Sequence, residues 1–154
     1  MTVLVDTSVL ARLATSNDPS YLVAEAAVLE LRRWGETLLT AAQNLIEFRN
    51  FATRPVADNG LGLPVPEAQA KSEEFESLFT VVSDTPDIYP AWKLLANLSA
   101  ATGKQVHDVR LIAICKVNNI DQVLTFNVRH FLRLAVFVPG ISIVSPNSIT
   151  EPKE

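Results

Sequence analysis

Three acids and one amide stand at positions of this sequence where they could form a site. Asp6 ends the apolar run TVLVD, Glu47 lies in NLIEF, Asp108 opens the apolar segment HDVRLIAI, and Asn127 follows VLTF. Three carboxylates brought together repel one another and lose hydration, a cost that a fold tolerates mainly when a cation lies among them. Oxygen ligands without cysteine, and with only peripheral histidines, favour Mg²⁺ or Mn²⁺ over zinc.

Each of these residues also has a simpler explanation when it is taken alone. Asp6 and Asp108 precede or open apolar helical segments, where an aspartate can accept hydrogen bonds from free backbone amides. Glu47 alone is typical of a solvated helix face, and Asn127 alone could cap a short helix. Asn44 lies three residues before Glu47, so both side chains would project from one helix face. A cation site can therefore form only if the fold brings Asp6, Glu47, Asp108 and Asn127 close together.

Hydrophobic patterning predicts an alternation of strands and helices. The expected strands cover 2–5, 36–40, 80–84, 121–126 and 141–145, and the expected helices cover 8–15, 21–34, 41–53, 67–79, 90–103, 107–117 and 127–134. This alternation is typical of an α/β fold with a mainly parallel, five-stranded sheet flanked by helices. Ligands of such sheets bind beyond the carboxyl ends of the strands, which is where Asp6 would lie. We expect one domain over 1–146 and a frayed tail over 147–154.

Composition limits the class of protein further. With 154 residues, of which 48% are hydrophobic and 19% charged, the chain suits one folded domain rather than a disordered protein. No apolar run approaches the roughly 18 residues of a membrane span, and no signal peptide precedes the first strand, so we expect a cytoplasmic protein. The net charge of −4 weakens a bulk electrostatic attraction to nucleic acid, although residues 102–133 are locally basic. Cys115, the single cysteine, lies in an apolar run and is expected to be a buried small hydrophobe.

Four motifs in this order resemble those of the PIN domain, in the style of the VapC toxins of toxin–antitoxin pairs: VLVDTSVLARL, NLIEF, HDVRLIAIC and VLTFNVRHF. The resemblance extends from about Val3 to Ser145. It implies that the chain folds as a PIN-like domain and acts as a metal-dependent ribonuclease that uses Mg²⁺ or Mn²⁺. It further implies that the RNA products carry 5′-phosphate and 3′-hydroxyl ends. It also implies a homodimer and a cognate antitoxin whose C-terminal segment covers the acidic site and a groove between the early helices. The apolar helix 21–34 is a candidate wall of that groove, and the loop 54–66 is expected to border the substrate channel.

The resemblance also implies roles for individual residues. Asp6, Glu47 and Asp108 match the three acids of that site, with Asp6 and Asp108 as direct metal ligands and Glu47 acting through a water. Asn127 matches the place where many members carry a fourth acid. An amide oxygen can bind a metal but brings no charge, so we expect one firmly held ion and leave open a second ion that is recruited with the substrate phosphate. The supporting positions are Ser8, with Thr7 as a second candidate, Asn44 and Thr125.

Several basic residues near these motifs could contact RNA phosphates. Arg129 and His130 follow Asn127, and Arg110 lies two residues after Asp108, so these three are our candidates. Arg49 and Arg54, near Glu47, are open to the same interpretation. Ordinary surface solvation is the simpler explanation of each of them.

Three alternatives remain open at this point. His107 and His130 could form a metal-free acid–base pair, which predicts cyclic-phosphate products and insensitivity to chelators. Asp84 could be a phosphoacceptor if it followed a middle strand, although its surroundings are typical of a turn. Finally, Asn127 could mark a degenerate module that binds RNA or a protein partner without cleaving.

Overall fold

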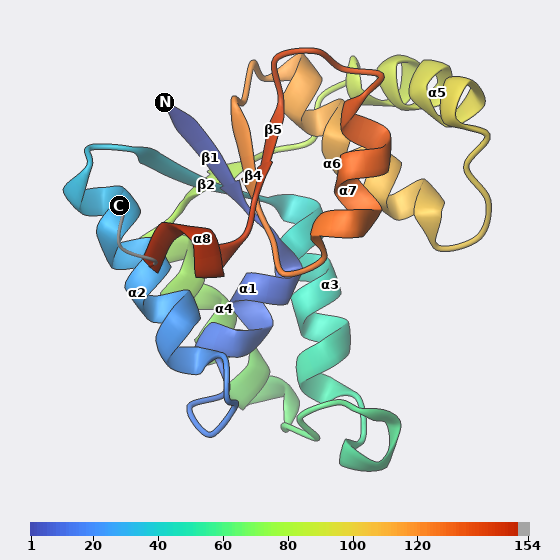
Figure 1. The fold of residues 1–154 in the computed structure, drawn as a ribbon. Coiled ribbons are helices and arrows are strands. Elements are labelled where there is room, and N and C mark those ends of the chain that lie inside the picture. Colours follow the sequence, from blue (N-terminus) through green and yellow to red (C-terminus); the bar gives the residue numbers. More distant parts are fainter. Residues whose placement is uncertain (151–154) are drawn as a thin grey trace.

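The protein is an α/β fold built around one parallel sheet, as the alternation of elements predicts (Figure 1). The computed structural model describes residues 1–150. Its strands are β1 (Thr2–Val5), β2 (Thr37–Ala41), β3 (Thr80–Val82), β4 (Gln122–Leu124) and β5 (Ser142–Val144). They lie in the order β3-β2-β1-β4-β5, and all four pairings are parallel.

Strand β1 lies at the centre of the sheet, and its end is the point at which the strand order reverses. Val3 pairs with Leu38 of β2 on one side and with Gln122 of β4 on the other. In open parallel sheets a crevice forms beyond the strand ends at such a reversal. Asp6 follows β1 directly, and its backbone amide donates to the carbonyl of Leu124 (3.0 Å). The fold therefore places Asp6 at this crevice.

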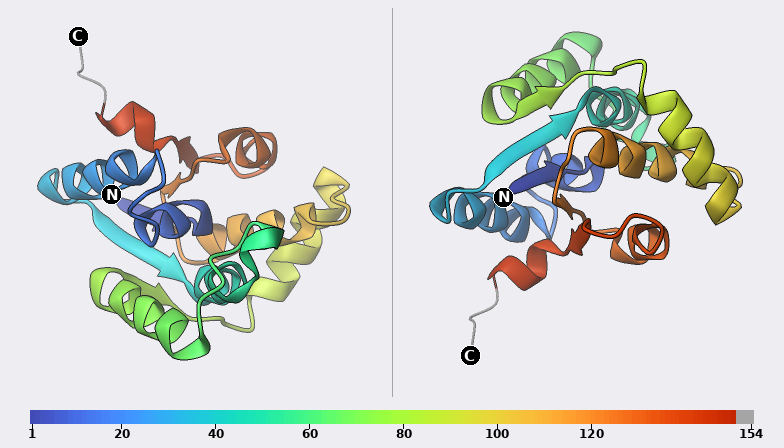
Figure 2. Two further views of the ribbon diagram at one scale, coloured as in Figure 1. Left: turned by 90° about the horizontal axis from the view of Figure 1, so that it is seen from below. Right: turned by 90° about the horizontal axis from the view of Figure 1, so that it is seen from above.

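Helices cover both faces of the twisted sheet. They are α1 (Thr7–Leu13), α2 (Tyr21–Arg33), α3 (Ala42–Thr53), the short 3₁₀ helix η1 (Val56–Asp58), α4 (Val65–Leu78), α5 (Ile88–Ser99), α6 (Gln105–Val117), α7 (Val128–Ala135) and α8 (Pro146–Thr150). Leu4 of β1 packs in a core with α5, α6 and α7, whereas Val3 and Val5 pack in a second core with α1 to α4. Figure 2 shows the α5–α7 group on one side of the sheet and α2 and α4 on the other. Because side chains alternate along a strand, one short strand serves both cores.

The end of the described chain differs from the prediction. We predicted a frayed tail from residue 147, but residues 146–150 form α8, which packs against α2. Its partly buried Ile149 joins the core formed by α1 to α4, which explains why the segment is ordered. The prediction is therefore wrong for 147–150, and 151–154 lie outside the described residues. Over residues 1–150, no helix is long and apolar enough to cross a membrane.

Candidate active site

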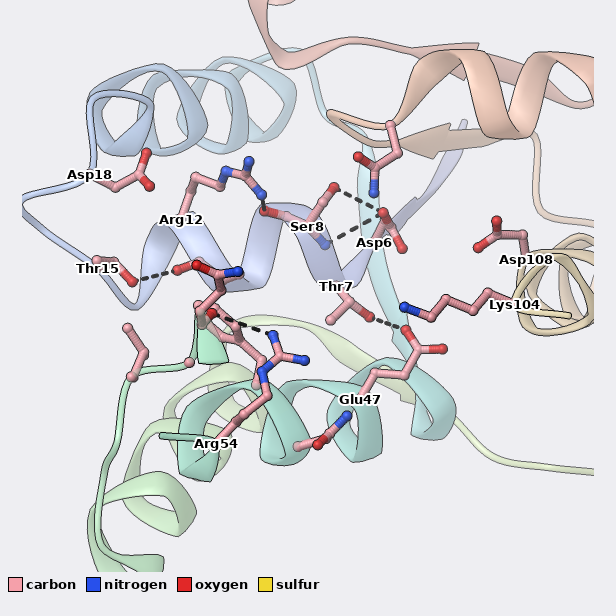
Figure 3. Close-up of a pocket in the computed structure, with 17 residues that line it drawn as sticks. Asp6, Thr7, Ser8, Arg12, Thr15, Asp18, Glu47, Arg54, Lys104 and Asp108 are labelled. Atoms are coloured by element: carbon pink, nitrogen blue, oxygen red, sulfur yellow. Dashed lines mark hydrogen bonds between the residues drawn. The ribbon is translucent and has the colours of Figure 1, made fainter. Parts of the chain in front are cut away.

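A cavity of about 690 Å³ opens at the end of β1, and all four predicted residues line it (Figure 3). Asp6 comes from the end of β1, Glu47 from α3, Asp108 from the first turn of α6, and Asn127 from the residue before α7. The segment after α3, which we expected to border a substrate channel, contributes its Asn59–Leu61 portion to the wall. The fold thus brings together residues from four separate parts of the sequence.

Asp6 is almost completely buried, with 3% of its surface exposed. Its Oδ2 accepts hydrogen bonds from Thr125 Oγ1 (2.7 Å), Ser8 Oγ (2.9 Å) and Ser8 N (3.4 Å). The last of these bonds makes Asp6 the N-cap of α1, so the simpler explanation of this residue is also correct. Burial raises the pKa of Asp6, and the hydrogen bonds from Thr125 and Ser8 oppose this effect. Within residues 1–150, no side chain donates a hydrogen bond to its other oxygen, Oδ1.

Ser8 and Thr125 also connect the start of α1 to the loop after β4. Ser8 Oγ accepts a hydrogen bond from Phe126 N (3.0 Å), and Thr125 Oγ1 accepts one from Asn127 N (2.9 Å). Both hydroxyl-bearing residues are buried, whereas Asn127 is exposed at the mouth of the cavity. These bonds fix the backbone of Asn127 close to the strand that carries Asp6.

Glu47 is oriented by two neutral donors. Thr7 Oγ1 donates to its Oε2 (2.7 Å), and Gln43 Nε2 donates to its Oε1 (2.8 Å). The buried Asn44 donates to Thr7 Oγ1 (3.1 Å) and accepts from the amide of Ala41 (3.0 Å). Thr7, our second candidate beside Ser8, and Gln43, which sequence reasoning missed, therefore hold Glu47 directly.

Asp108 is not a helix cap in this structure. The N-cap of α6 is Lys104, and among the described residues no backbone amide donates to the Asp108 carboxylate. Burial and the negative charge of Asp6 raise the pKa of Asp108 to about 6, and the interactions of Asp108 with His130 and, less strongly, with His107 oppose this. The nearest basic atom is His130 Nδ1, 4.0 Å from Asp108 Oδ2.

The chemistry of these residues fits a hard divalent cation. The donors are carboxylate oxygens, and their mutual repulsion would be relieved by a positive ion. Over residues 1–150, no three or more His, Cys, Asp or Glu side chains are grouped closely enough to form a complete metal cage. Mg²⁺ usually takes only one or two carboxylates and keeps several waters, so Asp6 and Asp108 with water suit it.

The residues predicted to contact phosphate lie outside this cavity. Arg110 donates to Gln43 Oε1 (2.9 Å) and pairs with Asp84 Oδ1 (2.9 Å), so it orients the amide that holds Glu47. Arg129 and His130 are exposed on α7 and do not line the cavity. Asp84 follows β3, which is an edge strand, so it does not have the middle-strand position that a phosphoacceptor of this type needs.

Three basic residues do line the cavity, namely Arg12, Arg54 and Lys104. Arg54 was one of the ambiguous basic residues, and the other two were missed. A signal for Arg12 was present in the sequence, since it lies four residues after Ser8 and therefore on the same helix face.

Comparisons with known proteins agree with this architecture. Residues 3–136 match the PIN domain family, and the chain belongs to this family. It resembles the solved structure of VapBC2 from Rickettsia felis, with a TM-score of 0.69 and 15% identity over 94% of this chain and 98% of that one. It also resembles VapBC-1 from nontypeable Haemophilus influenzae, with a TM-score of 0.67 and 17% identity over 96% of this chain and 99% of that one. A third similar structure is VapC20 from Mycobacterium tuberculosis, with a TM-score of 0.59 and 19% identity over 83% of this chain and 92% of that one. It is described as a sarcin–ricin loop cleaving toxin. No curated protein sequence matches the chain significantly.

Proposed function

We propose that this protein is a metal-dependent endoribonuclease. The observation that carries the proposal is the meeting of Asp6, Glu47 and Asp108 in one cavity, where burial and, after it, the negative charges of Asp6 and Glu47 raise the pKa of Asp108. Asp6 and Asp108 are the proposed direct ligands of one Mg²⁺ or Mn²⁺ ion. A bound ion of this kind lowers the pKa of its water and stabilises charge on a phosphoryl oxygen.

The protein side chains would supply orientation. Glu47, fixed by Thr7 and Gln43, can orient the water that attacks the phosphodiester in line with the leaving oxygen. Asn127 can bind a substrate or water oxygen through its amide at the mouth of the cavity. With the 3′ oxygen as the leaving group, as the family resemblance implies, the water oxygen would bond to phosphorus while the P–O3′ bond breaks, which leaves a 5′-phosphate and a 3′-hydroxyl end.

The comparisons support a role as the toxin of a toxin–antitoxin pair. The solved structures similar to this chain include VapBC complexes and a toxin–antitoxin complex from Klebsiella pneumoniae. We propose that a cognate antitoxin covers the acidic cavity, that the chain forms a homodimer, and that it acts in the cytoplasm on an RNA substrate.

A metal titration tests the proposed ligands without requiring the RNA to be known. We would titrate Mn²⁺ into the purified protein by calorimetry, beside Asp6→Asn, Asp108→Asn and the control Asp87→Asn. Asp87 is exposed at the start of α5 and outside the cavity. We expect Mn²⁺ binding to be lost in both cavity variants and kept in the control. RNA cleavage by the parent protein in Mn²⁺, blocked by EDTA, would then establish the activity.

Two features favour a second candidate, a module that binds RNA or a partner without cleaving. The family resemblance puts Asn127 where many members carry a fourth acid, and the described residues form no complete three-ligand cage. Absence of Mn²⁺ binding with and without RNA would support this candidate and contradict the nuclease. Chelator-insensitive cleavage with cyclic-phosphate ends would instead indicate the pair His107 and His130, although His107 lines a separate cavity.

A further inference from the structure

Two arginines line the cavity in addition to the acids. Arg12 comes from the last turn of α1, and Arg54 follows the end of α3 (Figure 3). Within residues 1–150 neither forms an ion pair with a carboxylate, and the Nε atom of each is buried without a hydrogen-bond partner. Half-buried positive charges without a counterion are favourable positions for a bound anion.

Arg12 is held in place before any ligand binds. Its Nη1 donates to the carbonyl of Ser8 (3.1 Å), one helical turn earlier, and its guanidinium lies 5.0 Å from the centre of the Phe126 ring. Stacking on an aromatic ring restricts a guanidinium while leaving several of its N–H groups available. Arg12 is thus tied to the two segments that also hold Asp6.

Arg54 is held by the loop that follows it. Its guanidinium lies 5.9 Å from the centre of the Phe51 ring, and its Nη2 donates weakly to the carbonyl of Asn59 (3.4 Å). Gly60 allows this loop to turn back closely, because a Cβ there would lie 2.0 Å from the carbonyl oxygen of Arg54. The loop therefore packs against Arg54 and limits where its side chain can go.

We propose that Arg12 and Arg54 form a second phosphate-binding site, which holds the RNA strand away from the phosphate that is cleaved. The Arg12 guanidinium reaches back along α1 to the carbonyl of Ser8, two residues after Asp6, and Arg54 lines the same cavity. Because both arginines share one cavity with the acids, a single RNA strand can place a phosphate near the scissile one against them. This proposal rests on the proposed function for its ligand, RNA, but not on cleavage.

RNA is a better ligand for this arrangement than an acidic protein segment. A nucleic-acid strand presents regularly spaced phosphates, so one strand can reach the arginines and the cation site in the same cavity. Both ligands would meet the carboxylates of Asp6, Glu47, Asp108 and Asp18, which also line the cavity, so the regular spacing of the RNA phosphates is what favours RNA.

Binding measured without divalent metal separates this site from catalysis. We would follow the anisotropy of a labelled, ten-nucleotide RNA of random sequence in EDTA, between 20 and 200 mM salt. The proteins would be the parent, Arg12→Gln, Arg54→Gln, and Arg49→Gln as the control. Arg49 lies on α3, contacts Gln69 and does not line the cavity, so its substitution removes the same charge elsewhere.

Each cavity substitution is expected to weaken RNA binding about tenfold at the lowest salt concentration, as for the loss of a charge-assisted hydrogen bond. It should also reduce the slope of log K against log salt by about 0.7, the value for one phosphate contact on a single strand. The control should change neither quantity. Thermal melting of each variant checks that it is folded, and Arg54→Gln, at a helix end, tests the proposal even if Arg12→Gln unfolds.

Three results would overturn the proposal: no RNA binding by the parent protein, equal losses in the control and the cavity variants, or tighter binding of a labelled poly-glutamate peptide than of RNA. A parent protein that binds RNA through these arginines but never cleaves it in Mn²⁺ would contradict the nuclease and leave this second site intact.

Discussion

Replacing Asp108 by asparagine should stabilise the metal-free protein at neutral pH. The pKa of Asp108 is about 6 in the folded state, against 3.8 for an ordinary aspartate. The folded state therefore binds more protons between these values, and the free energy of unfolding falls as pH rises from about 4 to about 6. Two pKa units correspond to at most about 3 kcal/mol. Because 30% of the side chain is exposed, solvent screening reduces this, and we expect about 1–2 kcal/mol.

Urea unfolding in EDTA at pH 4 and pH 7.5 measures this effect. Asp108→Asn should be more stable than the parent at pH 7.5, and the difference should shrink at pH 4, while Asp87→Asn shows no such change with pH. Excess Mn²⁺ should then stabilise the parent and not Asp108→Asn, because only a protein that binds the ion gains from it. A variant that is less stable than the parent at pH 7.5 would refute the reasoning, since it would mean that the charged carboxylate supports the fold.

Three further substitutions test other parts of the structure. Thr125→Val removes the shortest hydrogen bond to the buried Asp6 and should lower the free energy of unfolding by about 1–3 kcal/mol, as measured by urea denaturation at pH 7. Gln43→Leu removes one of two donors to Glu47 and should reduce RNA cleavage at least tenfold with little change in Mn²⁺ affinity, which separates water orientation from metal binding. Phe48→Ala empties a fully buried position in the core of α1 to α4 and should cost about 3–5 kcal/mol, with thermal unfolding as the readout.

The fold could be predicted from the sequence because its strongest signals are local. Short β-branched runs alternate with helical segments, and both patterns survive in the structure with boundaries that move by a few residues. The helix predicted over 90–103 shows the limit of this reasoning, since α5 runs from Ile88 to Ser99. Helix α8 could not be predicted, because it is held in place by packing against α2, which is distant in the sequence.

The candidate site was only partly readable from sequence. The acids could be proposed because strand ends and helix starts meet at one edge of a parallel sheet. The contacts of Gln43 and Arg110 could not, because they depend on how α3 and α6 pack side by side. Arg110 illustrates the difference, since its proximity to Asp108 in sequence suggested a phosphate contact, whereas its side chain points to Gln43 and Asp84.

The hydrogen-bond donors to Asp6 and Glu47 explain how the cavity can remain negatively charged. Within residues 1–150, the side chains that donate to Asp6 or Glu47 are all neutral, namely Ser8, Thr125, Thr7 and Gln43. An arginine or lysine in their place would orient the carboxylates equally well, but its charge would cancel the attraction for a cation. Neutral donors fix the positions of the carboxylates and leave their negative charges uncompensated. These charges destabilise the metal-free protein, and the raised pKa of Asp108 reflects this cost. The arginines lie in the same cavity but are bonded to backbone carbonyls and stacked on aromatic rings instead of being paired with these acids, so both kinds of charge stay available to ligands.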